Sequence, residues 1–186
     1  MNLKNKKMSS IQVKDKLFEL SIKEEVILEA IDKIAKAMNE DLGDKNPLFI
    51  CVLNGGFMFA SDLLKRLNFP CEISFIRLQS YQKSSTNGQI KEIYGLQGNI
   101  ENRNVVILED IIDTGYTMSF LKKELLSKKP NMLKVATLLF KPKALSVELE
   151  PDYVALEISN EFIVGYGLDY DGHGRNLRDI YKIKES

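Results

Sequence analysis

Cysteine, net charge and long apolar runs are scarce in this chain of 186 residues, and each shortage excludes a class of protein. The two cysteines, Cys51 and Cys71, lie in apolar runs and cannot form a secreted disulfide framework, which favours a reducing, cytoplasmic setting. No apolar run approaches about 18 residues and the polar start has no apolar core, so we expect neither a membrane span nor a signal peptide. The 26 basic residues balance 26 acidic ones, which argues against nucleic acid or an anionic membrane as a partner.

The chain does contain enough apolar sequence for one folded domain. Hydrophobic residues make up 44% and charged residues 28% of it, close to the average for soluble globular proteins. At roughly 150 residues per domain, this length corresponds to about one domain. We expect a single domain over residues 1–186, with residues 1–10 flexible.

Helical and strand patterns alternate along the chain. The segment Ser21 to Glu24 has the pattern of a capping box, followed by an amphipathic helix that ends before Gly43. Residues 48–53 are continuously apolar, as in a strand covered on both faces. Further elements are expected as helices at 57–67 and 117–128 and as strands at 72–78, 105–108, 135–140, 153–158 and 162–164. This alternation predicts an α/β fold with a mainly parallel, twisted sheet flanked by helices.

The stretch from residue 79 to residue 97 is polar and carries almost no apolar side chains before a short extended segment at 90–96. Long polar loops in compact domains are usually functional lids or disordered segments. We expect residues 79–93 to form a mobile loop.

The most informative segment is VVILEDIIDTGYT, which ends at Thr117. A buried strand there leads to two adjacent carboxylates, Glu109 and Asp110, which are costly in an apolar setting unless they meet water, cations or hydroxyls. Mg²⁺ prefers such oxygen ligands beside substrate phosphates. Thr114, Gly115 and Thr117 fit a cradle of backbone N–H groups for a phosphate, although Asp113 or Thr114 could equally serve as a helix cap.

The sequence resembles the purine phosphoribosyltransferases of the hypoxanthine/guanine type over about residues 21–181. Four motifs occur in the family's order: LNGG at residues 53–56, the pair Ser80-Tyr81, EDIIDTG at residues 109–115, and a terminal set of Lys141, FIVGYGLDY and Arg175. The resemblance implies the type I phosphoribosyltransferase fold, with a small hood built from the terminal segments. It also implies a homodimer or homotetramer.

The reaction that the resemblance implies is Mg²⁺-dependent transfer of 5-phosphoribosyl from phosphoribosyl pyrophosphate (PRPP) to N9 of hypoxanthine or guanine, giving IMP or GMP and pyrophosphate. Glu109 and Asp110 would hold the ribose hydroxyls, directly or through Mg²⁺. Gly55 and Arg175 would contact the pyrophosphate. The 5′-phosphate would lie on the backbone of Asp113, Thr114, Gly115, Tyr116 and Thr117.

The same resemblance implies roles around the purine. Asp113 would hydrogen-bond N7 and accept its proton, and Lys141 would donate to the 6-oxo group. Phe162 would stack on the base and Ile163 would contact it through its backbone. Asp169, beside the purine site, resembles a ligand of a second Mg²⁺, while Ser80 and Tyr81 would close over the reacting centre.

Some features depart from the family or admit other interpretations. Many relatives carry Lys where this chain has Asn54, and Tyr116 occupies a variable position. Taken singly, Lys141 and Arg175 are typical of solvated surface residues. His173, between glycines in a polar segment, is expected to be exposed and has no assigned role. A xanthine-preferring transferase and a non-catalytic PRPP-sensing regulator of the same fold are the alternatives.

Overall fold

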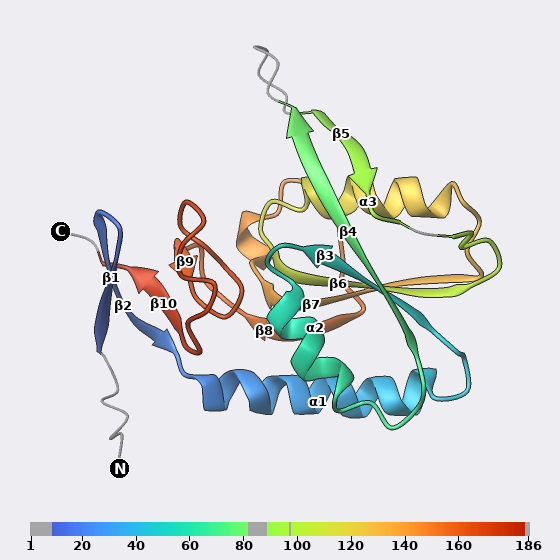
Figure 1. Ribbon diagram of the computed structural model, residues 1–186, viewed down its shortest axis with the longest axis horizontal. Coiled ribbons are helices and arrows are strands. Elements are labelled where there is room, and N and C mark those ends of the chain that lie inside the picture. The colour runs from blue at the N-terminus through green and yellow to red at the C-terminus, as the bar shows by residue number, and fades with distance from the viewer. Residues whose placement is uncertain (1–8, 82–88, 97, 185–186) are drawn as a thin grey trace.

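The computed structural model describes residues 9–81, 89–96 and 98–184. Its larger described sheet has six strands in the order β5-β4-β3-β6-β7-β8 (Figure 1): Gln89–Tyr94, Glu72–Tyr81, Leu48–Leu53, Asn104–Ile112, Met132–Phe140 and Tyr153–Glu157. Strands β4, β3, β6, β7 and β8 are parallel to one another, whereas the edge strand β5 is antiparallel to β4. The expected mainly parallel α/β sheet is confirmed.

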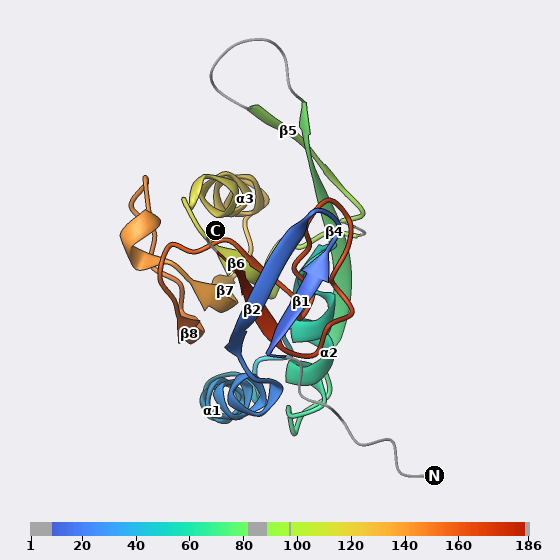
Figure 2. The same cartoon turned by 90° about the vertical axis from the view of Figure 1, so that its left-hand side faces the viewer.

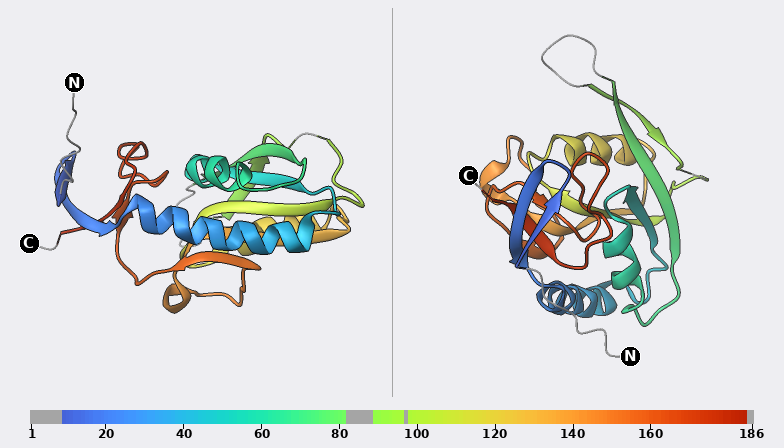
Figure 3. Two further views of the ribbon diagram at one scale, coloured as in Figure 1. Left: turned by 90° about the horizontal axis from the view of Figure 1, so that it is seen from below. Right: turned by 60° about the vertical axis from the view of Figure 1, so that its left-hand side comes forward.

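Helices cover both faces of this sheet, which explains the uninterrupted apolar run of β3. Phe49 and Cys51 of β3 pack against α1 (Glu24–Leu42) and α2 (Phe57–Leu64). The alternate residues Leu48, Ile50 and Val52 pack on the opposite face with α3 (Tyr116–Leu126). Figure 3 shows α1 lying along the sheet on the face away from α3.

A second sheet forms a hood at one end of the first (Figures 1 and 2). Its order is β1-β2-β10-β9, with bounds Ser10–Val13, Lys16–Ile22, Ile180–Ile183 and Ile163–Val164. Because β2 pairs with β10, the two ends of the chain build the hood together, as expected. None of the helices in the described residues is both long and apolar enough to span a membrane.

The start of α1 differs from the expected capping box. Ser21 belongs to β2, and Lys23, at the N-cap position, makes no side-chain cap. The N–H of Glu24 instead donates to Oδ1 of Asp179 at 2.8 Å. The prediction of a capping box was therefore wrong, because the acceptor for the first helical N–H comes from Asp179, near the far end of the chain.

Several elements differ in length from the expected ones. Helix α2 ends at Leu64, three residues before the expected end, and β6 continues to Ile112, so that the acidic pair lies inside the strand. Strand β4 extends to Tyr81 and pairs with β5, so residues 79–81 and 89–93 of the expected loop are in strands. Residues 82–88 lie outside the described residues, as do residues 1–8, and the expected mobility of both segments stays a prediction.

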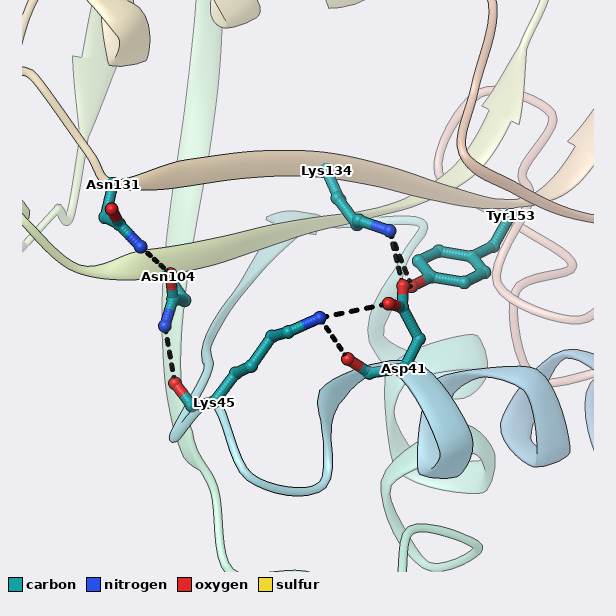
Figure 4. Close-up of polar contacts among 6 residues, drawn as sticks. All are labelled: Asp41, Lys45, Asn104, Asn131, Lys134 and Tyr153. Atoms are coloured by element: carbon teal, nitrogen blue, oxygen red, sulfur yellow. Dashed lines mark hydrogen bonds and ion pairs between the residues drawn. The ribbon is translucent and has the colours of Figure 1, made fainter.

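A polar cluster ties α1 to the amino ends of the parallel strands (Figure 4). The carboxylate of Asp41, near the end of α1, accepts hydrogen bonds from Lys134 of β7 and from the hydroxyl of Tyr153 at the start of β8. Lys45 Nζ lies 3.1 Å from Oδ1 of the same carboxylate. This cluster lies at the sheet edge opposite to the carboxyl ends of the strands.

Candidate active site

The site lies at the carboxyl ends of β3 and β6, the neighbouring strands from which the strand order proceeds in opposite directions. Ligands of open α/β sheets bind at this switch point. A cavity of about 310 Å³ opens there, lined by residues that include Leu53, Leu78, Asp113, Thr114 and Gly115. The fold therefore places the EDIIDTG motif at the expected ligand position.

The turn into α3 leaves the first turn of the helix without a side-chain cap. The N-cap residue is Gly115, with φ of +83°, and none of the described side chains makes a cap hydrogen bond to the helix start. A Cβ at this position would lie 2.9 Å from the side chains of Leu145 and Val147, so both conformation and space favour glycine. Capping by Asp113 or Thr114 is thus excluded. The uncapped N–H groups and the helix dipole suit a phosphate.

The acidic pair forms one wall of the site. Glu109 is 7% exposed, and burial, the charge of Asp110 and the hydrogen bond between the two carboxyl groups raise its pKa well above the usual range. Burial also raises the pKa of Asp110, against the opposing effect of the hydrogen bond with Glu109 and the charge of Arg175. The Ile111 N–H donates to Asp110 Oδ1 at 2.8 Å. Hydroxyl donors or a cation would stabilise these carboxylates.

Gly55 lies between the acidic pair and the hood. A Cβ added to Gly55 would overlap the carboxylate of Asp110. Gly167, with φ of +99°, is equally restricted, because its Cβ would overlap the carbonyl oxygen of Gly55. The peptide bond preceding Asn54 is cis, and Asn54 itself is exposed. The sequence analysis assigned no role to Gly167. The repeated glycine in GYG, at residues 165–167, was the pattern that could have indicated a close backbone approach.

Lys141 and Asp113 meet because adjacent strands present them side by side. Ile112 of β6 and Phe140 of β7 are register partners, so the next residue of each strand leaves the sheet at the same point. Lys141 Nζ donates to Asp113 Oδ2 at 2.9 Å, and the Lys141 N–H donates to the Ile112 carbonyl at 3.0 Å. Lys141 is only 5% exposed, which excludes a solvated surface role.

Arg175 and Asp169 form a second ion pair in the hood. Their atoms Nη2 and Oδ1 are 2.5 Å apart, and Arg175 Nη1 donates to the Gly167 carbonyl at 2.7 Å. Asp169 also accepts the N–H of Gly172 at 2.6 Å. The guanidinium is therefore held beside the segment that contacts Gly55.

Phe162 lies on the hood, where it lines a separate cavity of about 410 Å³ with Glu161 and Lys182. Its side chain is 48% exposed, whereas Ile163 is buried. The hydrogen bond from Lys182 lowers the pKa of Glu161.

Two further expectations concern the pair Ser80 and Tyr81, which was expected to close over the site, and the exposure of His173. Ser80 and Tyr81 lie on β4. Their side chains are outside the described part of the structure, so their closure over the site stays a prediction. His173 is exposed, as expected. Its backbone exchanges hydrogen bonds with that of Tyr170, at 2.9 and 3.0 Å.

The donor set fits Mg²⁺ held partly by substrate. In the described part of the chain, no three His, Cys, Asp or Glu residues come together as a metal site. Mg²⁺ usually binds through one or two carboxylates together with substrate phosphates, which the pair Glu109 and Asp110 can provide. Asp169 already pairs with Arg175, so a cation bound by Asp169 would share its carboxylate with the guanidinium.

A buried carboxylate pair beside an uncapped helix start, at the switch point of a parallel sheet, is the arrangement with which α/β proteins bind phosphorylated ligands. The family model of the phosphoribosyl transferase domain matches residues 21–171. The chain therefore belongs to the phosphoribosyltransferase family and, within it, to the hypoxanthine-guanine phosphoribosyltransferases of purine salvage.

Relatives and solved structures support this assignment over most of the chain. The hypoxanthine-guanine phosphoribosyltransferase of Streptococcus pyogenes is 41% identical over 160 residues, covering 86% of this chain and 89% of that protein. A crystal structure of such an enzyme from Bacillus anthracis has a TM-score of 0.80 at 36% identity, covering 90% of this chain and 97% of the other. The hypoxanthine phosphoribosyl transferase of Trypanosoma cruzi has a TM-score of 0.84 at 34% identity, with 94% and 95% coverage.

Proposed function

We propose that the chain transfers the 5-phosphoribosyl group of PRPP to N9 of hypoxanthine or guanine, giving IMP or GMP and pyrophosphate. The observation that carries this proposal is the Lys141–Asp113 pair, which lies directly beside the uncapped start of α3. A 6-oxopurine needs one donor for O6 and one acceptor for the N7 proton. This pair supplies both next to a phosphate-binding turn.

The sugar phosphate binds along β6 and the start of α3. The N–H groups at residues 114–117 receive the 5′-phosphate, and the helix dipole adds to this attraction. Glu109 and Asp110 accept hydrogen bonds from the ribose hydroxyls. These bonds satisfy carboxylates that are otherwise buried beside each other.

The base enters between the cavity and the hood. Lys141 donates to O6, while Asp113 gives up its contact with Lys141 and accepts the proton from N7 as N9 forms its bond to C1′. Phe162 stacks on the purine and the backbone of Ile163 contacts its edge. The C1′–O bond to pyrophosphate breaks in the same step, and the electron pair leaves with the pyrophosphate oxygen.

The pyrophosphate leaves toward the hood. Gly55 contributes a backbone N–H, and Arg175 contributes a guanidinium whose two-pronged geometry suits phosphate oxygens. Mg²⁺, when bound, neutralises the charge that develops on the leaving group. Glu109, Asp110 and Asp169 are the carboxylates that would hold it. Closure over the site by Ser80 and Tyr81 is part of the proposal and limits the access of water to C1′.

Assembly and location belong to the same proposal. Ile73 and Phe75 are 39% and 45% exposed and, two residues apart on β4, project from the same face of the sheet. Phe57, at the start of α2, is 42% exposed. Such apolar surface supports a homodimer or homotetramer. The two free thiols, Cys51 and Cys71, support a cytoplasmic location.

The test is nucleotide formation by the purified chain. With PRPP, Mg²⁺ and hypoxanthine, we expect IMP by chromatography and an equal amount of pyrophosphate. Omitting Mg²⁺ should abolish the product. Folded protein, checked by circular dichroism, that forms no IMP or GMP would refute the proposal, and product from xanthine alone would favour the xanthine-preferring alternative.

A further inference from the structure

We propose that Tyr170 is a positioning residue that ties the turn between β1 and β2 to Phe162, and so holds the ring on which the purine stacks. This inference rests on the proposed function, because it assumes that a base stacks on Phe162. It assigns the N-terminal hairpin, which contributes no residue to the proposed reaction, a part in base affinity.

Three aromatic rings meet in the hood, one from β2 and two from the segment at residues 162–170. The ring centroids of Phe162 and Tyr170 are 5.9 Å apart at an interplanar angle of 86°, an edge-to-face contact. Phe18 of β2 lies 6.2 Å from Phe162 and 6.1 Å from Tyr170. Each pair is within the range of favourable aromatic contacts.

The cluster is buried on one side and open on the other. Phe18 is fully buried, whereas Phe162 remains 48% exposed. A half-exposed phenyl ring keeps one plane only when neighbouring groups block rotation about its side-chain torsions. Phe18 and Tyr170 occupy that supporting position. The free surface of Phe162 is thereby prepared for stacking before a base arrives, which lowers the entropy lost on binding.

Tyr170 is itself held by the turn between β1 and β2. Its hydroxyl donates to Oδ1 of Asp15 at 2.9 Å. The next residue, Asp171, forms an ion pair with Lys14 of the same turn. Two successive residues of the 169–173 turn are therefore fastened to two successive residues of the hairpin.

The turn also restrains Tyr170 from within. The Tyr170 N–H donates to the His173 carbonyl at 2.9 Å, and the His173 N–H donates to the Tyr170 carbonyl at 3.0 Å. Asp169, which precedes Tyr170, pairs with Arg175. Tyr170 therefore lies next to Asp169, on the proposed pyrophosphate side, while its ring contacts Phe162, on the proposed base side.

The test separates base affinity from PRPP affinity. We would prepare Tyr170→Phe, Asp15→Ala, the double variant and Tyr170→Leu. For each, the KM values of hypoxanthine and PRPP and the equilibrium dissociation constants of IMP and PRPP would be measured. Tyr153→Phe is the matched control, because it removes another hydroxyl-to-aspartate hydrogen bond at the opposite edge of the sheet.

Loss of the hydroxyl contact should weaken hypoxanthine and IMP binding about two- to tenfold, the net value of one hydrogen bond. Loss of the ring in Tyr170→Leu should weaken them about three- to tenfold beyond Tyr170→Phe. PRPP binding should change less than about twofold. The double variant should equal the single variants, because both remove the same contact.

Unchanged hypoxanthine and IMP binding in all variants would overturn the inference. Equal weakening of PRPP and base, or additive effects of Asp15→Ala and Tyr170→Phe, would also overturn it. The wild-type protein is measured first. Absence of turnover there would count against the proposed function itself, whereas an active wild type with insensitive variants would refute only the role of Tyr170.

Discussion

Lys141 Nζ lies 2.9 Å from Asp113 Oδ2, and the two side chains differ sharply in exposure, at 7% and 47%. The lysine side chain is therefore fixed by the residues packed around it, while the carboxylate of Asp113 remains open to the cavity. A base can approach Asp113 without displacing Lys141 from its buried position. Such a fixed donor is already oriented before binding, as expected for a group that selects among substrates.

Replacing Asp113 with Asn should slow catalysis while leaving PRPP binding nearly intact. The amide retains much of the shape but cannot accept the N7 proton, and loss of a general base typically costs ~10²–10⁴-fold. Steady-state kcat and the dissociation constant of PRPP are the measurements. Wild-type turnover in this variant would remove Asp113 from the mechanism.

Replacing Lys141 with Ala should raise the KM for hypoxanthine by about 10- to 100-fold, the value of a hydrogen bond from a charged donor. The KM for PRPP should change far less, because in the proposed reaction the lysine side chain binds the base and not PRPP. Lys143→Ala is the matched control, since Lys143 is exposed two residues further along. Equal changes in both KM values would contradict the assignment.

Replacing Gly55 with Ala should lower kcat/KM for PRPP about 100-fold, because the new Cβ displaces the Asp110 carboxylate and small misplacements of this kind are costly. Gly98→Ala is the control, because Gly98 has a φ of +80° that alanine adopts only with strain, whereas nothing lies within 4 Å of an added Cβ there. Gly55→Ala with wild-type kinetics would show that the Gly55–Asp110 contact is not needed.

The Asp41 cluster in Figure 4 should make stability depend on pH. Hydrogen bonds from Lys134, Tyr153 and Lys45, in that order, lower the pKa of Asp41 in the folded protein. A lowered folded-state pKa contributes stability above the unfolded value of about 4, and this contribution is lost as pH falls toward the folded-state pKa.

Asp41→Asn should therefore lower the free energy of unfolding by about 1–2 kcal/mol at pH 7, with a smaller difference below about pH 4. Urea unfolding from pH 3 to pH 7 measures it, with the exposed Asp44→Asn as the control. A difference that is absent at pH 7, or that grows as pH falls, would contradict this account.

Local patterns were sufficient where packing is local or repetitive. The run at residues 48–53 predicted β3 with both bounds correct, because a strand buried on both faces has no polar position. The turn after β6 was recognised for similar reasons. Its glycine and threonines follow the apolar strand within a few residues and mark a turn into a helix.

Contacts between distant segments could not be read from the sequence. The Asp179 cap of α1 and the Asp15–Tyr170 hydrogen bond each span 155 positions. The Lys141–Asp113 contact spans 28 positions and depends on the register of β6 against β7. The family resemblance supplied both residues of that pair, but their contact and the burial of Lys141 required the fold.

The most direct test of the account compares initial rates of PRPP-dependent nucleotide formation with hypoxanthine, guanine, xanthine and adenine under one set of conditions. The Lys141–Asp113 pair predicts rapid turnover with hypoxanthine or guanine, one pyrophosphate per nucleotide, and a rate with adenine lower by about 10³-fold or more, because a buried ammonium has no acceptor for an amino group. Adenine turnover equal to that of hypoxanthine, or no turnover with any of the four bases, would contradict it.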